Sequence, residues 1–310
     1  MNWTAFLFLA VQAGTPLLFA TLGEIITEKV GNLNLGVEGM MLIGAVAGFS
    51  VGFATHSPLL AMLGAFIAGG LSALIFAFLT VTLRVNQVVT GLSLTIFGAG
   101  VSGFAGKALA GRVVPEEIKN FFAKIKIPGL GDIPLIGRVL FQQDWFIYFG
   151  YLLVAVVGIY LYKTKIGLNV RVVGENPSAA DASGINVSLY KYVHILLGGA
   201  LCGLGGAYLA LVYVPAWQEN ITAGRGWIAV ALVIFATWNP YKALAGSYFF
   251  GALSVVGLYL QKFDIRISLF LIDMLPYVVT IVVLIFISMK NVRENSPPKA
   301  LGEPYFREDR

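Results

Sequence analysis

The sequence predicts an all-α membrane protein, a polytopic bundle of about nine transmembrane helices with an accepted range of about eight to ten. Of its 310 residues, 58% are hydrophobic and only 12% are charged, whereas a soluble globular domain carries about 25% charged residues. Apolar runs that approach the ~20 residues of a membrane-spanning helix recur along the chain. The 36 glycines fit helices that approach one another closely in lipid.

Nine apolar runs are the candidates for these spans. Residues 1–23 contain no Lys or Arg, so the first run lacks the basic region of a cleavable signal peptide and is expected to remain as a span. Several later runs are short or interrupted by glycine, which gives the count its range. The runs are 5–22, 39–54, 58–83, 88–105, 145–162, 193–213, 227–238, 243–261 and 268–288.

The runs define a predicted membrane domain over 1–288 and a tail over 289–310. The tail contains five basic residues, the adjacent Pro297 and Pro298, and no apolar run. Such a segment buries too little apolar surface to offset the entropy of ordering. We therefore predict that the tail is disordered.

Composition argues against several classes of function. Because the chain has a single cysteine, Cys202, and two histidines, neither a Cys-based nor a His-rich metal site is expected, and no catalytic residue is proposed. The pattern G-x-x-x-x-G-K-[ST] of a phosphate-binding loop does not occur, so ATP-driven work would need a partner. The net charge of +5 is scattered between apolar runs, which suits loops near anionic lipid better than nucleic-acid binding.

The polar gaps between the spans indicate an orientation only weakly. The gap 106–144 contains six basic residues, whereas 163–192 and the tail together contain nine. The positive-inside rule therefore places 163–192 and the tail on the inner side by a small margin. Within 106–144, Pro115 precedes a stretch, 116–122, that predicts a short surface helix.

A polar, glycine-rich segment follows the first span. Ionisable groups at membrane depth usually face a water-filled cavity or one another, and glycine permits unwound backbone there. Two interpretations stay open: a broken helix lining a polar path, or a solvated loop between the first two spans. The polar residues are Glu24, Glu28, Lys29, Asn32, Asn34 and Glu38. Of these, Asn32, Asn34 and Glu38 are the candidates for contact with a solute.

Glycines recur every four residues directly after this segment, at Gly44, Gly48 and Gly52. This spacing places them on one helix face. A stripe of small residues predicts close helix packing more readily than a ligand site.

The segment 174–187 predicts a helix of about two turns outside the membrane. Asn176 suits the N-cap, Pro177 the first helical position, and Gly184 the C′ position. Isolated helices of this length are marginal in water, so a docking partner would stabilise it. The alternative is an interfacial helix on lipid headgroups, but its face is Ala and Ser rather than bulky and apolar.

Three further features are ambiguous. Asn86 and Gln87 between the third and fourth runs could line a path or form a loop. Trp217 and Trp238 stand where an interfacial aromatic belt would place them. Asp273 in the last run could make an internal polar contact or lie near the outer surface.

Four motifs occur in an order and spacing that resemble the membrane permeases of bacterial ABC importers for simple sugars, branched-chain amino acids and nucleosides. They are G-N-L-N-L-G-V-E-G-M-M-L-I-G-A (31–45), N-Q-V-V-T-G-L-S-L-T-I-F-G (86–98), G-E-N-P-S-A-A-D-A-S-G-I-N-V (174–187) and G-R-G-W-I-A-V-A-L-V-I-F-A-T-W-N-P (224–240). The resemblance covers about 5–288. Sugar permeases of this group tend to carry an acidic G-I-D-L-S-V-G at 31–39, so this chain is most similar to the nucleoside branch.

The resemblance implies a permease in the bacterial cytoplasmic (inner) membrane that binds no cofactor itself. It would pair with a second, homologous permease as a heterodimer. Cytoplasmic ABC ATPases would hydrolyse the ATP, and an extracellular or periplasmic nucleoside-binding lipoprotein would deliver the solute. The segment 174–187 would be the cytoplasmic coupling helix, whose implied contact residues are Gly174, Glu175, Asn176, Pro177, Ala179, Ala180 and Gly184.

The expected function is nucleoside import without covalent chemistry, along a path lined by Asn32, Asn34 and Glu38 with Asn86 and Gln87 behind them. A simple-sugar or amino-acid permease is an alternative, because amides suit any small polar solute. An ion-coupled secondary transporter is less favoured, because it would need carboxylates within the spans, where Asp273 is the candidate. A membrane-embedded enzyme would need clustered His, Asp or Cys, which the sequence lacks.

Overall fold

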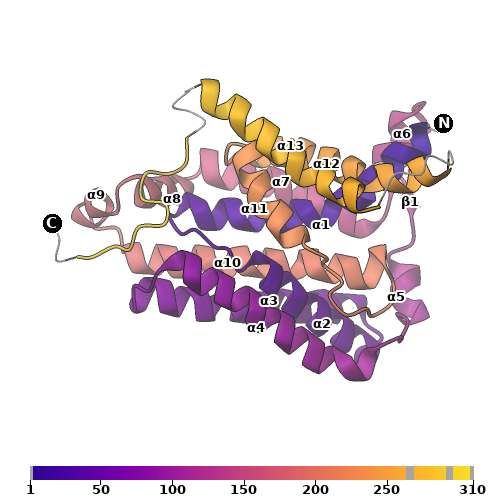
Figure 1. Ribbon diagram of the computed structural model, residues 1–310, viewed down its shortest axis with the longest axis horizontal. Coiled ribbons are helices and arrows are strands. Elements are labelled where there is room, and N and C mark those ends of the chain that lie inside the picture. The colour runs from indigo at the N-terminus through magenta and orange to yellow at the C-terminus, as the bar shows by residue number, and fades with distance from the viewer. Residues whose placement is uncertain (1–2, 263–268, 291–295, 308–310) are drawn as a thin grey trace.

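The computed structural model describes residues 3–262, 269–290 and 296–307, and these are helical along most of their length (Figure 1). Two long helices, α1 (Trp3–Lys29) and α10 (Val187–Tyr208), pack against each other at the centre. The remaining elements surround them. They are α2 (Val37–Thr55), α3 (Pro58–Ala77), η1 (Phe78–Thr82), α4 (Gln87–Gly106), η2 (Lys107–Leu109), α5 (Glu116–Phe121), β1 (Ile125–Lys126), η3 (Leu130–Asp132), α6 (Ile136–Leu140), β2 (Gln142–Gln143), α7 (Trp145–Lys163), α8 (Lys165–Glu175), α9 (Pro177–Ala182), η4 (Leu209–Tyr213), α11 (Arg225–Phe235), α12 (Pro240–Lys262) and α13 (Leu269–Lys290).

Six helices in the described part of the chain are long and apolar enough to cross a membrane. They correspond to the first six predicted runs and are α1, α2, α3 with η1, α4 with η2, α7, and α10 with η4. Helix α11 has 11 residues, which is too short for a span of about 20. Helices α12 and α13 occupy the last two predicted runs, so the count of nine spans stays a prediction.

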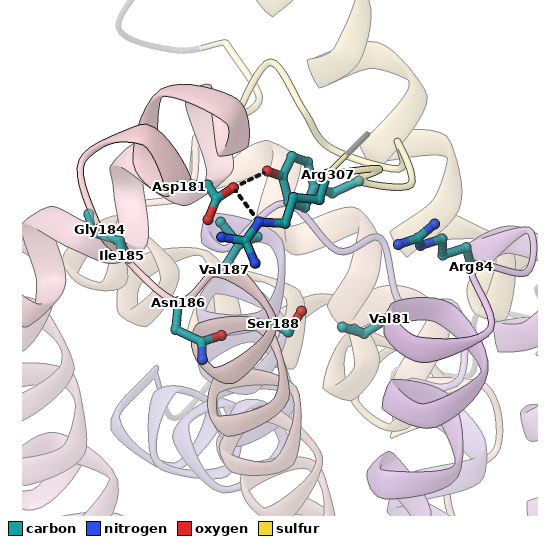
Figure 2. Close-up of a pocket in the computed structure, with 10 residues that line it drawn as sticks. Val81, Arg84, Asp181, Gly184, Ile185, Asn186, Val187, Ser188 and Arg307 are labelled. Carbon is teal, nitrogen blue, oxygen red and sulfur yellow. Dashed lines mark hydrogen bonds and ion pairs between the residues drawn. The ribbon is translucent and has the colours of Figure 1, made fainter. Parts of the chain in front are cut away.

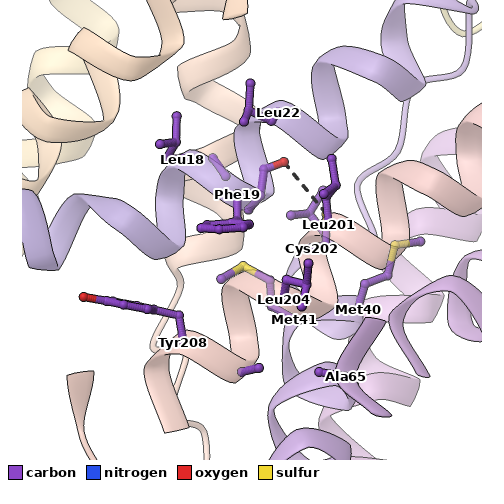
Figure 3. Packing of buried hydrophobic residues seen from close by; sticks show 14 of the residues in the cluster. Leu18, Phe19, Leu22, Met40, Met41, Ala65, Leu201, Cys202, Leu204 and Tyr208 are labelled. Atoms are coloured by element: carbon purple, nitrogen blue, oxygen red, sulfur yellow. Dashed lines mark hydrogen bonds between the residues drawn. The ribbon is translucent and has the colours of Figure 1, made fainter. Parts of the chain in front are cut away.

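The interior is built by α1, α2, α3 and α10, whose closest approaches are made by glycine. A Cβ atom added to Gly44 of α2 would lie 2.2 Å from Cα of Gly203 in α10, and one added to Gly206 would lie 1.9 Å from the carbonyl oxygen of Met41. The small-residue stripe therefore packs α2 onto α10, which confirms the packing interpretation. Cys202 is buried beside α1, with Sγ 3.8 Å from the carbonyl oxygen of Ala20 (Figure 3).

Large apolar side chains cover the outer faces of the peripheral helices. Helices α3, α4 and α7 expose an apolar surface that a water-soluble monomer rarely presents. Such a surface suits contact with lipid or with another membrane chain. Among its side chains are Leu63, Ile67, Leu71, Ile96, Phe104, Leu152 and Val156.

One end of the bundle carries the 106–144 segment (Figure 1). Strands β1 and β2 pair antiparallel, with Ile125 opposite Gln143. Helix α5 begins directly after Pro115, which confirms the predicted surface helix. The segment is tied to the α10–α11 connection, because Val114 N–H donates to the carbonyl oxygen of Pro215 at 3.1 Å.

The opposite end carries α8 and α9, together with the described part of the tail (Figure 1). Composition predicted a disordered tail, yet residues 296–307 pack against this end, with Pro298 and Ala300 buried. Backbone hydrogen bonds to Gly31 and Gly174 hold this segment. Composition cannot reveal such bonds, because they depend on which distant backbone groups the fold leaves within reach.

Candidate functional site

A break between α1 and α2 forms the core of the candidate site. Helix α1 ends at Lys29, and Gly31 follows in the left-handed region with φ +90°. The N–H of Gly31 donates to the carbonyl oxygen of Glu28 at 2.9 Å, and that of Asn32 donates to Thr27 at 3.2 Å. These two bonds form a Schellman closure, which favours glycine at the left-handed position. The chain then runs without regular structure through residues 32–34 before α2 begins.

The broken segment is buried, which excludes the solvated-loop alternative. Both Asn32 and Asn34 have no exposed surface. Buried backbone groups outside a helix need partners from elsewhere in the protein. The neighbouring helices supply them here.

Side chains of α1 and α4 provide those partners. Asn34 N–H donates to Oε1 of Glu24 at 3.0 Å, and Leu33 N–H donates to Oε1 of Gln87 at 2.7 Å. The hydroxyl of Thr95 donates to the carbonyl oxygen of Leu35 at 2.9 Å. Residues from α1 and α4 therefore fix the unwound backbone between them.

Several buried polar atoms around this segment have no hydrogen-bond partner within the described residues. They are Glu24 Oε2, both side-chain polar atoms of Asn32, and Gln87 Nε2. An unsatisfied buried polar group costs about 1–3 kcal/mol, so such groups usually bind water or a ligand. This cluster can therefore offer both donors and acceptors to a small polar solute.

Glu38 takes a different position from the amides. Its Oε1 accepts hydrogen bonds from the Thr222 hydroxyl at 2.5 Å and from Gly224 N–H at 2.8 Å, and its Oε2 accepts from Gly226 N–H at 2.5 Å. Gly224 has φ +82° and immediately precedes α11. A carboxylate at a helix N-terminus pairs with unbonded N–H groups and with the positive end of the helix dipole. Glu38 thus joins the start of α2 to the start of α11.

The two predicted residues at the start of α4 separate in the structure. Gln87 is buried and contacts the broken segment. Asn86 is exposed and serves as the N-cap of α4, accepting a hydrogen bond from Val89 N–H at 3.1 Å. The structure therefore brings Asn32, Asn34 and Gln87 together and places Asn86 and Glu38 at helix starts.

Two acidic residues of α1 were not among the residues predicted to line the path. Two tryptophans also lie in surroundings that the sequence did not predict. Glu24 joins the polar cluster, and Glu28 accepts a hydrogen bond from the indole N–H of Trp238. Trp238 and Trp217 are both buried within the protein, so neither side chain projects outward as a residue of an interfacial belt would. The pairing of Trp238 with a buried carboxylate requires the fold, because the two residues are 210 positions apart.

The predicted helix at 174–187 is confirmed in its local structure. Asn176 caps α9 by accepting the Ala179 N–H at 3.0 Å, and Pro177 is the first residue of the helix. Its end is a Schellman closure, with Gly184 at φ +81° and Ile185 N–H donating to the carbonyl oxygen of Ala180 at 3.0 Å. Of the remaining residues implied by the resemblance, Glu175 and Ala179 are exposed, whereas Ala180 and Gly174 are buried.

Nothing in the described residues points to a metal centre, since they contain no group of three or more His, Cys, Asp or Glu side chains that could hold an ion. Asp273 lies outside the residues whose side chains are described.

These features define a multi-pass membrane protein with a polar break in its interior. The chain belongs to the family described as branched-chain amino acid transport system / permease component, whose model matches residues 6–287. No solved structure gives a significant match.

Several curated relatives of the chain are named as ABC transporter permeases. Over 303 residues the chain is 34% identical to the guanosine ABC transporter permease protein NupQ of Bacillus subtilis, covering 94% of this chain and 93% of NupQ. It is 35% identical over 305 residues to the nucleoside ABC transporter permease protein NupC of Lactococcus lactis, covering 94% of each. It is 41% identical over 263 residues to TsgC13 of Haloferax volcanii, provisionally described as a glucose ABC transporter permease protein, covering 83% of this chain and 78% of TsgC13.

Each of these three organisms also contains a second, more distant relative of this chain. They are the guanosine ABC transporter permease protein NupP of Bacillus subtilis, 23% identical, the nucleoside ABC transporter permease protein NupB of Lactococcus lactis, 21% identical, and the glucose ABC transporter permease protein TsgB13 of Haloferax volcanii, 29% identical.

Proposed function

We propose that the chain is a pore-forming subunit of an ATP-driven importer and passes nucleosides across the bacterial cytoplasmic membrane. The observation that carries the proposal is its similarity, over nearly its whole length, to permeases named for guanosine and nucleosides. The buried cluster around the α1–α2 break supports it, because a nucleoside presents both hydroxyl groups and base donors and acceptors to amide side chains.

In this proposal the solute contacts Asn32, Asn34 and Gln87, whose side chains are buried and gathered at one break in the helices. Glu38 and Asn86 contribute by fixing the starts of α11 and α4. In this proposal the chain has no ATPase of its own, and the energy comes from cytoplasmic ABC ATPases that contact α9. Their ATP-driven closure shifts α9 and alternates the access of the polar segment.

The remaining subunits of the importer also belong to the proposal. A second permease completes the path, and the occurrence of NupQ with NupP and of NupC with NupB favours a heterodimer. A substrate-binding lipoprotein delivers the nucleoside from the outer side. Glucose is the second candidate solute, favoured by the 41% identity to TsgC13.

Uptake of labelled guanosine, uridine, ribose and glucose in cells with and without this gene tests the cargo. Loss of guanosine and uridine uptake, with both sugars unaffected, is the expected result. Loss of glucose uptake alone would establish the second candidate and refute the nucleoside proposal.

The path is tested by Asn32→Ala, with Asn120→Ala as its control. Asn32 is fully buried in the cluster, whereas Asn120 is an exposed amide of α5 at the other end of the molecule. We expect Asn32→Ala to reduce nucleoside uptake at equal membrane abundance, while Asn120→Ala does not. Equal uptake by the two variants would remove Asn32 from the path.

A further inference from the structure

The described part of the tail bonds to two segments that are distant in sequence. Ala300 N–H donates to the carbonyl oxygen of Gly174 at 3.0 Å, and Gly302 N–H donates to the carbonyl oxygen of Gly31 at 3.3 Å. Gly174 lies near the end of α8, shortly before α9, and Gly31 lies just after the end of α1, in the broken segment. Residues 300–302 of the tail therefore connect the segment before α9 to the polar segment through these two backbone hydrogen bonds.

Side chains further along the tail attach it to α9. The Tyr305 hydroxyl donates to Oδ2 of Asp181 at 2.9 Å, and Nε of Arg307 lies 3.3 Å from the same oxygen (Figure 2). The Asp181 side chain is only 13% exposed. The guanidinium carbon of Arg84 lies 4.6 Å from the centroid of the Phe306 ring. The tail thereby contacts α9 and also Arg84, which lies in the connection between η1 and α4.

The backbones of the tail, of the end of α8 and of the segment after α1 are in direct contact where they meet. A Cβ atom added to Gly174 would lie 2.3 Å from the carbonyl oxygen of Lys29, and one added to Gly31 would lie 3.3 Å from that of Ala300. No side chain separates the three stretches of chain at this point. Groups packed this closely transmit a displacement rather than absorb it.

We propose that residues 300–307, here called the clasp, link the motion of α9 to the broken segment 30–36. The inference rests on the proposed function, because it assumes that an ATPase moves α9. When α9 shifts, the bonds at Asp181 carry the clasp with it. The bonds at Gly174 and Gly31 then move the end of α1, where Asn32 lies.

The test uses the whole importer, with its partner subunits, in proteoliposomes. Solute uptake and solute-stimulated ATP hydrolysis are measured for the wild type, for a chain ending at Asn295, and for the double variant Asp181→Ala, Tyr305→Phe. Glu303→Ala is the control, since Glu303 is an exposed tail residue whose side chain makes no hydrogen bond or ion pair with the described residues.

We expect the truncated chain and the double variant to hydrolyse ATP but to import ~5–150-fold less solute per ATP, the usual range of a coupling between sites. The control should match the wild type. If the truncated chain fails to insert, the double variant decides the matter, because it keeps the whole chain and changes only two partly buried side chains where α9 meets the tail.

Two results would overturn the clasp. One is unchanged uptake per ATP in the double variant. The other is loss of the ATPase subunit on purification, which would make the tail an assembly contact instead of a link. If the wild-type importer takes up no nucleoside, the proposed cargo is refuted, and the same comparison is then made with the solute that the wild type imports.

Discussion

Glu38→Ala removes the acceptor on which the start of α11 depends. Three donors converge on its carboxylate, namely the Thr222 hydroxyl and the N–H groups of Gly224 and Gly226. Thr222 and Gly226 are buried, and Gly224 is partly buried. An alanine therefore leaves these donors without an acceptor in a place that water reaches poorly.

The magnitude follows from these bonds. Each hydrogen bond to a charged group contributes about 1.5–3 kcal/mol, so three set a ceiling of about 5–9 kcal/mol. The alanine variant leaves three neutral donors, and each unsatisfied buried donor costs about 1–3 kcal/mol. Water entering the vacated volume satisfies part of this loss, so we expect about 3–5 kcal/mol. Glu38→Gln retains one oxygen but turns an amide N–H₂ toward a donor. We expect it to lose about 1–3 kcal/mol.

Hydrogen exchange at the Gly224 and Gly226 amides measures the effect directly, because it reports local opening. A loss of 3 kcal/mol corresponds to exchange that is faster by a factor on the order of one hundred. Glu219→Ala is the control, since Glu219 is an exposed carboxylate on the same connection. Nucleoside uptake should fall in the order wild type, Gln variant, Ala variant. Unchanged protection of these two amides in Glu38→Ala would refute the anchoring role.

Three further predictions concern stability, read as the thermal midpoint of the purified protein. Gly44→Ala forces α2 away from Gly203 and should lower the free energy of unfolding by about 1–3 kcal/mol. Gly100→Ala is the control and should not lower it, because nothing lies within 4 Å of the added Cβ. Equal thermal midpoints for the two variants would contradict this. Burial raises the pKa of Asp144 from 3.8 to about 6, so the folded protein binds the carboxyl proton more tightly than the unfolded chain does. The stability that this proton contributes is therefore lost as the pH rises through that interval. The midpoint of the wild type should fall more over this interval than that of Asp144→Asn, and parallel curves would exclude Asp144 as the cause. Asn86→Ala removes the α4 cap and should cost ~1 kcal/mol while Asn86→Asp does not, a difference that equal midpoints would disprove.

The sequence by itself determined the local features of this protein. Hydrophobic runs located the six long apolar helices, because lipid requires about 20 apolar residues in each span. The N-cap Asn176 and the left-handed Gly184 located α9, because capping depends on residues close in sequence. The glycines around 31–39 located the break after α1 for the same reason. The motifs added the family, which the match over residues 6–287 confirmed.

Only the tertiary structure decided which polar groups meet. Glu38 was predicted to line the path, but the structure bonds it to residues 184–188 positions away. Asn86 and Gln87 are adjacent, yet one is exposed at a cap and the other is buried beside Leu33. The tail has no apolar run, but its backbone N–H groups reach the carbonyl oxygens of Gly174 and Gly31. The reason is physical: capping and hydropathy act over a few residues, whereas the partner of a buried polar group is set by which distant segments the packed helices bring within about 3 Å of it.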